Sequence, residues 1–400
     1  MKKKLLIASY NMIVGGSTTA LIGLLNAIDR SQYDIDLILY KNEGKLFGFI
    51  PEDVHILPEA FICNGKYGLI KKWVKGIVSG YLIKARKTNR KIKQKGLSQQ
   101  VLYDFQVHEL SRTLPGHYDI AIGFLEGWAD RFIVSNVDAD IRIGWLHSTF
   151  EKIGVIPKLE ETWMNRVDSI ICVAQSCVED FVTAMPEYKH KAAYIPNIID
   201  AEYIKKRAME AVTNDSLYDC FVRCDCFKIV SVCRLSIETK GLDRMIAAAE
   251  GLVRCGYEFV WYVVGEGSDR SILEGMITER GLQKYIVLTG VRINPYPFIK
   301  AADVLCMASR WEGMPNTVTE AKILGTPCVV TEYLSAHEQI KQGIEGIIVR
   351  NDDGAIEKGL EWCLNNRQKL EEMSVFLMSS RYANKEAFRL LENELLKVRP

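Results

Sequence analysis

The sequence predicts an α/β protein built from two doubly wound domains, each with a parallel sheet. The chain has 400 residues, of which 48% are hydrophobic, and this length is too great for one ordinary core but suits two α/β domains. Short apolar runs alternate with helical patterns along the chain, and such alternation is typical of strands that pair in parallel. Two stretches also follow the order strand, Gly-containing loop and helix.

The predicted strands divide between the two halves of the chain. The first half has apolar runs at Lys4–Ser9, Ile35–Tyr40, Val54–Leu57, Tyr118–Gly123, Ile141–Leu146, Ser169–Val173 and Ala193–Ile195. The second half has them at Lys228–Cys233, directly before Gly265, and at Tyr285–Leu288, Asp303–Met307, Pro327–Val330 and Gly346–Val349. We therefore place domains at residues 1–200 and 201–375. Residues 362–398 are expected to be helical and charged throughout, with a C-terminal helix at 376–400.

Composition excludes several classes of protein. A formal net charge of +1 gives no overall reason to expect a nucleic-acid partner. The eleven cysteines are scattered, and no signal peptide precedes the first strand, so we expect free thiols in a reducing compartment. The tightest cysteine cluster, at positions 220, 224 and 226, has no second pair and no nearby His, which does not favour zinc. No apolar run approaches the roughly 18 residues of a membrane-spanning helix.

The most informative stretch is ASRWEGMPNTVTEAKILGTPCVV, residues 308–330. It predicts a strand end, a Gly-containing loop, a helix that begins near Asn316 or Thr317, and a second apolar strand. Such a loop directs unpaired backbone N–H groups and the positive end of the helix dipole towards an anion. Two carboxylates, Glu312 and Glu320, flank this predicted site. An alternative reading needs no ligand, because Thr317 and Glu320 have the spacing of a capping box.

A second Gly-containing loop follows the first predicted strand. Gly15 and Gly16 precede Ser17, a candidate N-cap for the apolar helix that comes next. Glycine at this place lets the backbone approach a phosphate closely, although the pair could equally form a simple tight turn. The spacing is not that of the full dinucleotide-binding fingerprint.

Two cations lie on either side of the loop that opens the second domain. Arg234 stands at the end of a predicted strand and Lys240 just before a helix. Both could be ordinary surface cations. A diphosphate, however, suits one Arg, which offers a bidentate fork, and one Lys, which offers a point charge. The next loop contains Gly265-Glu266-Gly267, but it lacks a third glycine and a ribose-binding acid, so a nicotinamide cofactor is disfavoured.

His147 is predicted at the carboxyl end of the fifth strand, within GWLHSTF. A lone His is usually structural. Ligands of open α/β sheets nevertheless bind at this edge, so we favour a functional role.

Residues 66–95 contain eleven Lys and Arg residues and no acid, with aromatic and aliphatic residues interleaved. Such a run is often a solvated helix face. The alternative is a basic, amphipathic surface for anionic lipid.

These strings resemble retaining, nucleotide-sugar-dependent glycosyltransferases of the GT-B type, whose two Rossmann-like domains face each other across a cleft. The resemblance rests on the Glu-x7-Glu spacing of Glu312 and Glu320 and on the R-L-x-x-x-K-G element from Arg234. It is strongest over residues 229–349 and weaker in the first 200, where it rests on the Gly-Gly loop, His147 and IPN at 195–197.

The resemblance implies roles for individual residues. Glu312 and His147 would lie beside the donor sugar, Glu320 would hold the nucleotide ribose, and Arg234 and Lys240 would bind the pyrophosphate. The other implied donor-binding residues are Gly15, Gly16, Gly265, Val291, Arg292, Gly313, Met314, Pro315, Asn316 and Thr317. In this family the first domain binds the acceptor and the last helix crosses back onto it.

The sequence shows no convincing set of metal ligands. Asp34-Ile35-Asp36 and Asp138-Ala139-Asp140 have Asp-x-Asp spacing, but we expect them at a strand start and in a turn of the first domain. We therefore predict a metal-independent enzyme without a cofactor. Arg234, Lys240 and backbone N–H groups near Pro315–Thr317 would stabilise the charge of the departing diphosphate.

The resemblance also implies the substrates and the partners. The donor would be a UDP-sugar that supplies a hexose-type sugar. The acceptor would be a glycan or lipid-linked saccharide in bacterial capsular or cell-surface polysaccharide synthesis. We expect a cytoplasmic protein, peripheral on the inner leaflet of the plasma membrane, without a nucleic-acid partner. The sequence leaves open the base and the sugar of the donor, the identity of the acceptor, the linkage, the oligomeric state and the role of the cysteines.

Two alternatives stay open. A non-catalytic GT-B module would be expected to have lost some of Glu312, Glu320, Arg234 and Lys240, and all four are present. A GT-B epimerase or phosphorylase would act on a soluble substrate and have no use for a basic surface.

Overall fold

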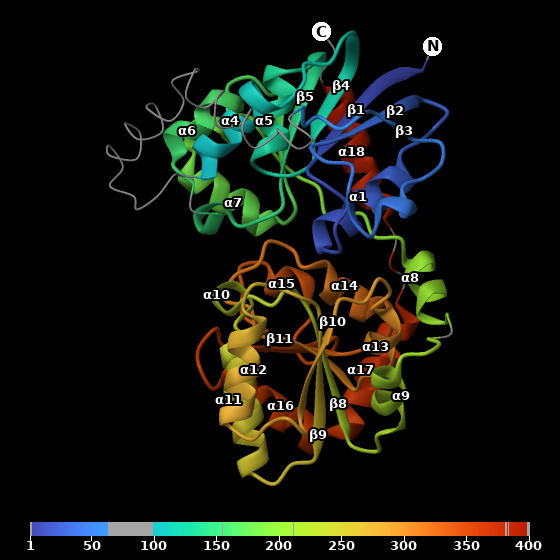
Figure 1. Ribbon diagram of the computed structural model, residues 1–400, viewed down its shortest axis with the longest axis vertical. Coiled ribbons are helices and arrows are strands. Elements are labelled where there is room, and N and C mark those ends of the chain that lie inside the picture. The colour runs from blue at the N-terminus through green and yellow to red at the C-terminus, as the bar shows by residue number, and fades with distance from the viewer. Residues whose placement is uncertain are drawn as a thin grey trace. The chain divides into compact units, whose positions relative to one another are not determined.

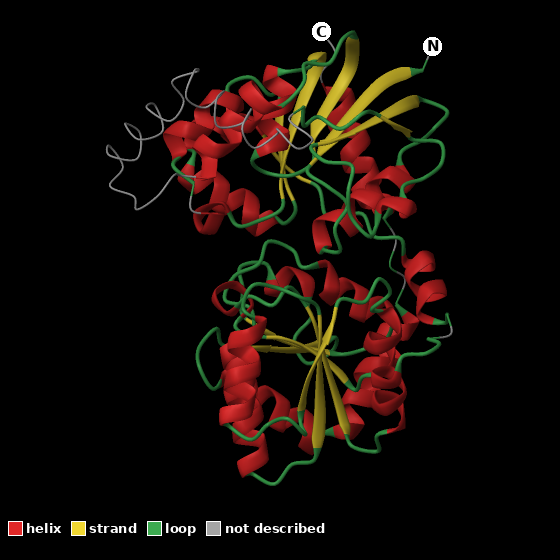
Figure 2. Ribbon diagram, viewed as in Figure 1, coloured by secondary structure: helices red, strands yellow, loops and turns green. Residues whose placement is uncertain are grey.

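The computed structural model describes residues 2–62, 99–153, 155–210, 212–380, 382 and 384–397. The chain forms two compact units, drawn in Figures 1 and 2. The first comprises Met1–Ile13, Ala20–Ile198 and Glu386–Pro400, and the second comprises Val14–Thr19 and Ile199–Lys385. The basic segment at 66–95 lies outside the described residues. In the described part of the chain, no helix combines the length and the apolar character needed to cross a membrane.

The first unit is built on a seven-stranded parallel sheet in the order β3-β2-β1-β4-β5-β6-β7. Its strands are β1 (Lys3–Ser9), β2 (Tyr33–Leu39), β3 (His55–Ile56), β4 (His117–Gly123), β5 (Asp138–Leu146), β6 (Ser169–Cys172) and β7 (Ala192–Tyr194). Strand β1 pairs with β2 on one side and β4 on the other, and its residues Leu5–Ala8 are fully buried. A strand that is apolar on both faces belongs in the centre of a covered parallel sheet.

Helices flank the first sheet, as Figure 2 shows in red. They are α1 (Gly16–Ala27), α4 (Gln99–Leu110), α5 (Trp128–Ser135), α6 (Pro157–Met164), α7 (Gln175–Ala184) and α18 (Lys385–Lys397), with short 3-10 turns at Phe47–Phe49, Phe150–Ile153 and Pro186–Lys191. The terminal helix α18 belongs to this unit, where Ser169 Oγ donates to Glu394 Oε2 at 2.9 Å. A buried Arg131 on α5 binds Glu160 Oε1 at 2.6 Å and Asp104 Oδ1 at 3.0 Å.

The second unit has a six-stranded parallel sheet in the order β10-β9-β8-β11-β12-β13. The strands are β8 (Phe227–Val232), β9 (Phe259–Val264), β10 (Ile286–Gly290), β11 (Val304–Met307), β12 (Cys328–Thr331) and β13 (Gly346–Val349). The helices are α8 (Ala201–Ala208), α9 (Ser216–Arg223), α10 (Ile237–Lys240), α11 (Leu242–Arg254), α12 (Arg270–Glu279), α13 (Tyr296–Ala301), α14 (Asn316–Ile323), α15 (Ala336–Gln339), α16 (Ala355–Asn365) and α17 (Arg367–Ser379).

Two hydrophobic clusters cover the two faces of this second sheet. Helices α11, α12 and α16 contribute to one cluster, and α8, α9, α13 and α14 contribute to the other. Figure 1 shows these two sets of helices on opposite sides of the fanned strands. Successive residues of a strand lie on opposite faces of the sheet: Ile229 is part of the first cluster and Val230 is part of the second. This alternation follows from the two-residue repeat of a strand.

The predicted fold class of two doubly wound, parallel-sheet α/β domains is confirmed. Three local predictions were wrong. The helical stretch at 362–398 is interrupted at Asn366 and after Ser379, so it belongs to α16, α17 and α18. Asp138 and Asp140 lie in β5 and not in a turn. The helix after the Gly-Gly loop already begins at Gly16, so Ser17 lies inside it.

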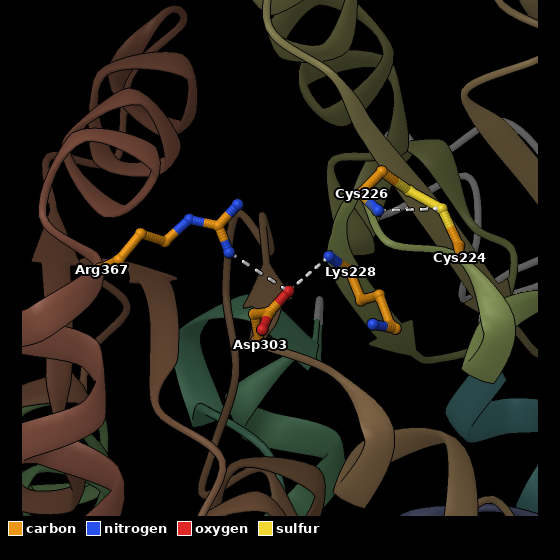
Figure 3. Close-up of a disulfide and its surroundings, with 5 residues drawn as sticks. All are labelled: Cys224, Cys226, Lys228, Asp303 and Arg367. Atoms are coloured by element: carbon orange, nitrogen blue, oxygen red, sulfur yellow. Dashed lines mark hydrogen bonds and ion pairs between the residues drawn. A yellow bond between two sulfur atoms is a disulfide. The ribbon is translucent and has the colours of Figure 1, made fainter.

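The expectation that the cysteines are free thiols was also wrong for one pair. Figure 3 shows a disulfide between Cys224 and Cys226, in the segment that joins α9 to β8. Eight further cysteines of the described chain are free. Asp303, directly before β11, accepts the backbone N–H of Lys228 in β8 at 2.7 Å and lies 3.6 Å from Arg367 of α17 (Figure 3). A Cys-x-Cys spacing alone did not distinguish a bond from two thiols.

Candidate functional site

The order of the second sheet reverses between β8 and β11. The helix after β8 leads to β9 on one side, whereas the helix after β11 leads to β12 on the other. Because these helices cover opposite faces, the loops diverge and leave a crevice at the carboxyl ends of the two strands. Arg234 follows β8, and Ser309 and Glu312 follow β11. The topology therefore brings these predicted site residues to one edge.

The two cations of the β8 loop differ in their surroundings. Arg234 is exposed, and within the described residues its guanidinium makes no hydrogen bond or ion pair. Lys240 ends α10, and Nζ lies 2.5 Å from Oε1 of Glu312. Arg234 is thus available to an anion, while the Lys240 ammonium is already engaged by a carboxylate.

Two glycines allow the loops at this edge to pack closely. Gly241, directly after Lys240, has a φ of 61°, and a Cβ there would lie 2.1 Å from the Ala308 carbonyl oxygen. Gly265 has a φ of 152°, and its Cβ would lie 1.9 Å from the carbonyl oxygen of Cys233. Any other residue would separate these backbones. The two glycines therefore act on the site by fixing the loop that carries Arg234 and Lys240.

The Glu312 carboxylate is held by a second donor. Ser309 Oγ donates to Glu312 Oε1 at 2.6 Å, the same oxygen that Lys240 binds. The Lys240 and Glu312 side chains are 18% and 11% exposed. A half-buried carboxylate with two donors on one oxygen has a defined orientation, since each hydrogen bond removes rotational freedom.

Helix α14 begins at Asn316, as predicted, but the capping-box interpretation is wrong. The N-cap is Pro315, which makes no side-chain capping hydrogen bond. Thr317 Oγ1 donates to the carbonyl of Val232 at 3.3 Å. Thr317 is therefore not the cap, and its hydroxyl joins the start of α14 to the end of β8.

Gly313, Met314 and the Gly-Gly loop border this helix start. Ser335 Oγ donates to the buried carbonyl of Gly313. Met314 follows Gly313 in the sequence and precedes the N-cap residue, Pro315. Gly15 and Gly16 are grouped with the second unit, where Asn316 Nδ2 donates to the Gly16 carbonyl at 2.8 Å. This hydrogen bond places the Gly15-Gly16 loop at the start of α14.

Glu320 lies inside α14 and is 5% exposed. Burial raises the pKa of its carboxyl to about 7, and a hydrogen bond with Tyr296 opposes this shift. Tyr296 begins α13 and is also buried. No cation pairs with Glu320 in the described residues. Its partner is a hydroxyl group, and it does not reach back to a backbone N–H as a capping box requires.

Val291 and Arg292 follow β10, but the Arg292 side chain is used within the fold. Its Nε lies 2.6 Å from Asp215 Oδ2, and Nη1 donates to the Thr289 carbonyl at 2.7 Å. Asp215 is itself the N-cap of α9 and accepts the N–H groups of Leu217 and Tyr218. These two implied donor-binding residues can therefore offer their backbone to a ligand, while the Arg292 guanidinium anchors α9.

His147 lies in the first unit, directly after β5, as predicted. Its ring packs against Phe124 and Trp145, with centroid distances of 4.7 and 6.1 Å. Burial lowers the pKa of the imidazole to about 4, although Glu126 and the Phe124 carbonyl act in the opposite direction. The buried Nε2 has no partner among the described residues. The ring is thus a neutral imidazole with one unused nitrogen.

The two Asp-x-Asp pairs lie at the amino edge of the first sheet, away from the carboxyl ends of its strands. His117 lies 3.0 Å from Asp138 and 3.2 Å from Asp140, and Asp36 accepts from Tyr118 at 2.7 Å. Across the described parts of the chain, no three His, Cys, Asp or Glu side chains gather in a way that would hold a metal ion.

Three residues of these clusters were not predicted from the sequence: Ser309, Tyr296 and Glu126. Ser309 lies inside the stretch at 308–330, and its position two residues after the buried strand β11 was an available signal. Glu126 follows β4, and its Oε2 accepts the backbone N–H of His147 at 2.9 Å. Tyr296 carried no sequence signal, because its contact with Glu320 joins two helices.

Part of the second unit matches a known family. Residues 225–375 match the family model described as glycosyl transferases group 1. That range lies within the second unit and includes Arg234, Lys240, Glu312 and Glu320.

Two curated relatives match parts of the chain. An uncharacterized glycosyltransferase of Methanocaldococcus jannaschii is 25% identical over 173 residues, which are 43% of this chain and 42% of that protein. The N-acetylgalactosamine-N,N'-diacetylbacillosaminyl-diphospho-undecaprenol 4-alpha-N-acetylgalactosaminyltransferase of Campylobacter jejuni is 26% identical over 203 residues, 50% of this chain and 52% of that protein. The chain thus spans about half the length of these relatives.

Solved structures match over the whole chain. HepE of Anabaena in complex with UDP-glucose has a TM-score of 0.70 and 16% sequence identity, covering 99% of this chain and 100% of that one. A likeness at this identity shows the fold alone, which is the GT-B fold. Residues 225–375 are thus similar to group 1 glycosyl transferases, and the chain as a whole has the GT-B fold.

Proposed function

We propose that the protein is a retaining glycosyltransferase that moves a hexose-type sugar from a UDP-sugar to a glycan or lipid-linked saccharide. The observation that carries the proposal is the carboxyl edge between β8 and β11. There an exposed Arg234, a Lys240–Glu312 pair and the N-terminus of α14 lie together. Cations and the N–H groups of a helix N-terminus suit a diphosphate, and a carboxylate beside them suits sugar hydroxyls.

In this proposal each residue has a distinct task. Arg234, Lys240 and the N–H groups at the start of α14 stabilise the negative charge of the departing diphosphate. Glu312 orients the donor sugar, Glu320 accepts the ribose hydroxyls, and the neutral imidazole of His147 contacts the sugar. Retention follows from front-face attack, in which the leaving phosphate accepts the proton of the acceptor hydroxyl. The reaction proceeds without a metal ion.

Relatives support the substrate class. The Campylobacter jejuni relative is named for a diphospho-undecaprenol saccharide, and the HepE structure contains UDP-glucose. We extend these to a UDP-sugar donor and a lipid-linked acceptor in capsular or cell-surface polysaccharide synthesis. We also propose a cytoplasmic location, with peripheral attachment through the basic residues at 66–95.

A screen of nucleotide-sugars by thermal unfolding tests the donor assignment. A ligand at 100 times its dissociation constant stabilises a protein by about 2.7 kcal/mol. We expect a UDP-sugar to raise the melting temperature, and release of UDP to require a saccharide acceptor. Stabilisation by no nucleotide-sugar would contradict the proposal. UDP release from a soluble substrate alone would favour an epimerase or phosphorylase, and binding without turnover would favour a non-catalytic module.

Sedimentation with vesicles tests the membrane assignment. Wild type should bind anionic vesicles at low salt, because each Lys or Arg contributes about 1 kcal/mol near an anionic bilayer. It should dissociate from them at high salt, because salt screens this attraction. A variant with Lys71, Lys72, Lys75, Arg86 and Lys87 changed to Gln should bind less. Equal binding by both proteins would leave the segment as a solvated face.

A further inference from the structure

Two hydrogen-bond donors that differ in mobility bind the Glu312 carboxylate. Lys240 Nζ and Ser309 Oγ both bind Oε1, at 2.5 and 2.6 Å. Lys240 carries its charge on a flexible four-carbon stem, and this ammonium is also the group that the proposed function assigns to the diphosphate. A diphosphate would compete with Glu312 for it. The hydrogen bond from Ser309 would then still hold Oε1 of Glu312.

Ser309 is built into the fold so that it cannot move. The residue is 0% exposed and follows β11, and its carbonyl accepts the hydroxyl of Thr331 at the end of β12. The next residue is fixed too: the Arg310 N–H donates to the Thr239 carbonyl at 2.9 Å, and Asn351 Nδ2 donates to the Arg310 carbonyl at 2.7 Å. Ser309 therefore presents its hydroxyl from a fixed backbone.

Neighbouring buried hydroxyls behave differently. Ser231 Oγ donates to the carbonyl of Cys306, Thr331 Oγ1 to that of Ser309, and Ser335 Oγ to that of Gly313. Each of these three satisfies a backbone carbonyl, which is the usual structural use of a buried hydroxyl. Ser309 instead donates to a side-chain carboxylate that belongs to the proposed site.

We propose that Ser309 is a positioning residue for Glu312, which holds Oε1 in place when the Lys240 ammonium engages the diphosphate of the donor. The inference rests on the proposed function, because it assigns a purpose to the orientation of Glu312. Ser309 does not itself touch the substrate. Its removal should therefore affect the chemical step more than donor binding.

The test is the replacement Ser309→Ala, which deletes one oxygen. Hydrogen bonds to charged groups are strong, so kcat should fall by roughly tenfold to a hundredfold, while the donor KM changes by less than about twofold. Ser309→Cys keeps the shape of the side chain with a larger sulfur atom and donates only weakly, and its kcat should resemble that of Ser309→Ala. The matched control is Ser231→Ala, in the same sheet and also buried, which should lower the melting temperature with kcat within about twofold of wild type.

A double-mutant cycle shows whether Ser309 acts through Glu312. In a Glu312→Ala background, Ser309→Ala should change kcat by less than about twofold, since the carboxylate that it positions is absent. An equal fall in both backgrounds, or a wild-type kcat for Ser309→Ala, overturns the inference.

Thermal unfolding tests the same double-mutant cycle without an activity assay. The losses in melting temperature from Ser309→Ala and Glu312→Ala should be non-additive if the two side chains bind each other. Additive losses would contradict the contact. A chain without transferase activity would thus refute the proposed function, while the unfolding cycle would still decide whether Ser309 holds Glu312.

Discussion

The ammonium of Lys240 lies 2.5 Å from Oε1 of Glu312, and both side chains are largely buried. The residue predicted to bind the diphosphate and the residue predicted to contact the sugar therefore neutralise each other in the chain without ligand. Arg234, on the same loop, is exposed and makes no such pair within the described residues. This difference separates the effects that the two cations should have when removed.

We expect Lys240→Ala and Arg234→Ala to lower kcat/KM by roughly tenfold to a hundredfold each, because each loses a charge-assisted contact with the diphosphate. Only Lys240→Ala should also lower the melting temperature, since it leaves Glu312 without its cation in a site with little water. The control is Arg350→Ala, whose surface ion pair with Asp352 should matter little. Wild-type efficiency in both variants would refute the assignment to the diphosphate.

The raised pKa of Glu320 predicts how stability depends on pH. Burial raises this pKa from 4.5 to about 7, so between these values the folded state holds a proton that the unfolded state has released. Its contribution is fully present below the unfolded pKa and is lost as pH rises through the folded pKa. The loss is on the order of 3 kcal/mol. Denaturant unfolding at a series of pH values should show this fall for wild type and a flatter profile for Glu320→Gln.

Donor binding should have the opposite pH dependence. A carboxylate that accepts ribose hydroxyl groups must be ionised, so UDP should lower the pKa of Glu320 and displace its proton below about pH 7. Calorimetry in buffers with different ionisation enthalpies would count the protons released. Wild type should release more protons than Glu320→Gln. Protons released by the titration of UDP itself cancel in the difference between the two proteins. An unchanged proton count, or an unchanged donor KM in Glu320→Gln, would exclude a contact with the ribose.

The sequence predicted the strands of both sheets because their signal is local. A buried parallel strand is a short apolar run between turns, and the run at Lys228–Cys233 differs from the observed β8 by one residue at each end. The clustering of Arg234 with Glu312 also followed from sequence, since the carboxyl ends of parallel strands share one edge.

Contacts between side chains could not be predicted in this way. Lys240 and Glu312 are 72 positions apart, and Arg292 and Asp215 are 77 apart, so no periodicity relates them. From the sequence alone, either Arg234 or Lys240 could have been the cation without an ion pair in the loop that follows β8. The capping-box reading failed for the same reason: the Thr317 hydroxyl donates to the carbonyl of Val232 in β8, which is 85 positions away in the sequence.

Metal independence stays a prediction, and chelation tests it. Activity should survive excess EDTA, because Arg234, Lys240 and the N–H groups of α14 already supply positive charge for the departing diphosphate. The assay needs metal-free buffers and a Mg²⁺-dependent glycosyltransferase as the positive control. Complete loss with EDTA, restored by Mg²⁺ or Mn²⁺, would show that the reaction uses a divalent ion.

Asn384 binds both backbone groups of Ile199: Oδ1 accepts the N–H at 3.1 Å, and Nδ2 donates to the carbonyl at 2.6 Å. Both residues lie in the second unit, at the two ends of its segment Ile199–Lys385. We expect Asn384→Ala to lower the free energy of unfolding by about 1–3 kcal/mol, because a half-buried N–H and carbonyl lose their partners. Asn384→Asp keeps the acceptor but not the donor and should cost less. Asn365→Ala, which removes an exposed hydrogen bond to Tyr257, should cost under about 0.5 kcal/mol. Denaturant unfolding measures all three, and equal values for Asn384→Ala and Asn365→Ala would show that the paired contact with Ile199 does not stabilise the chain.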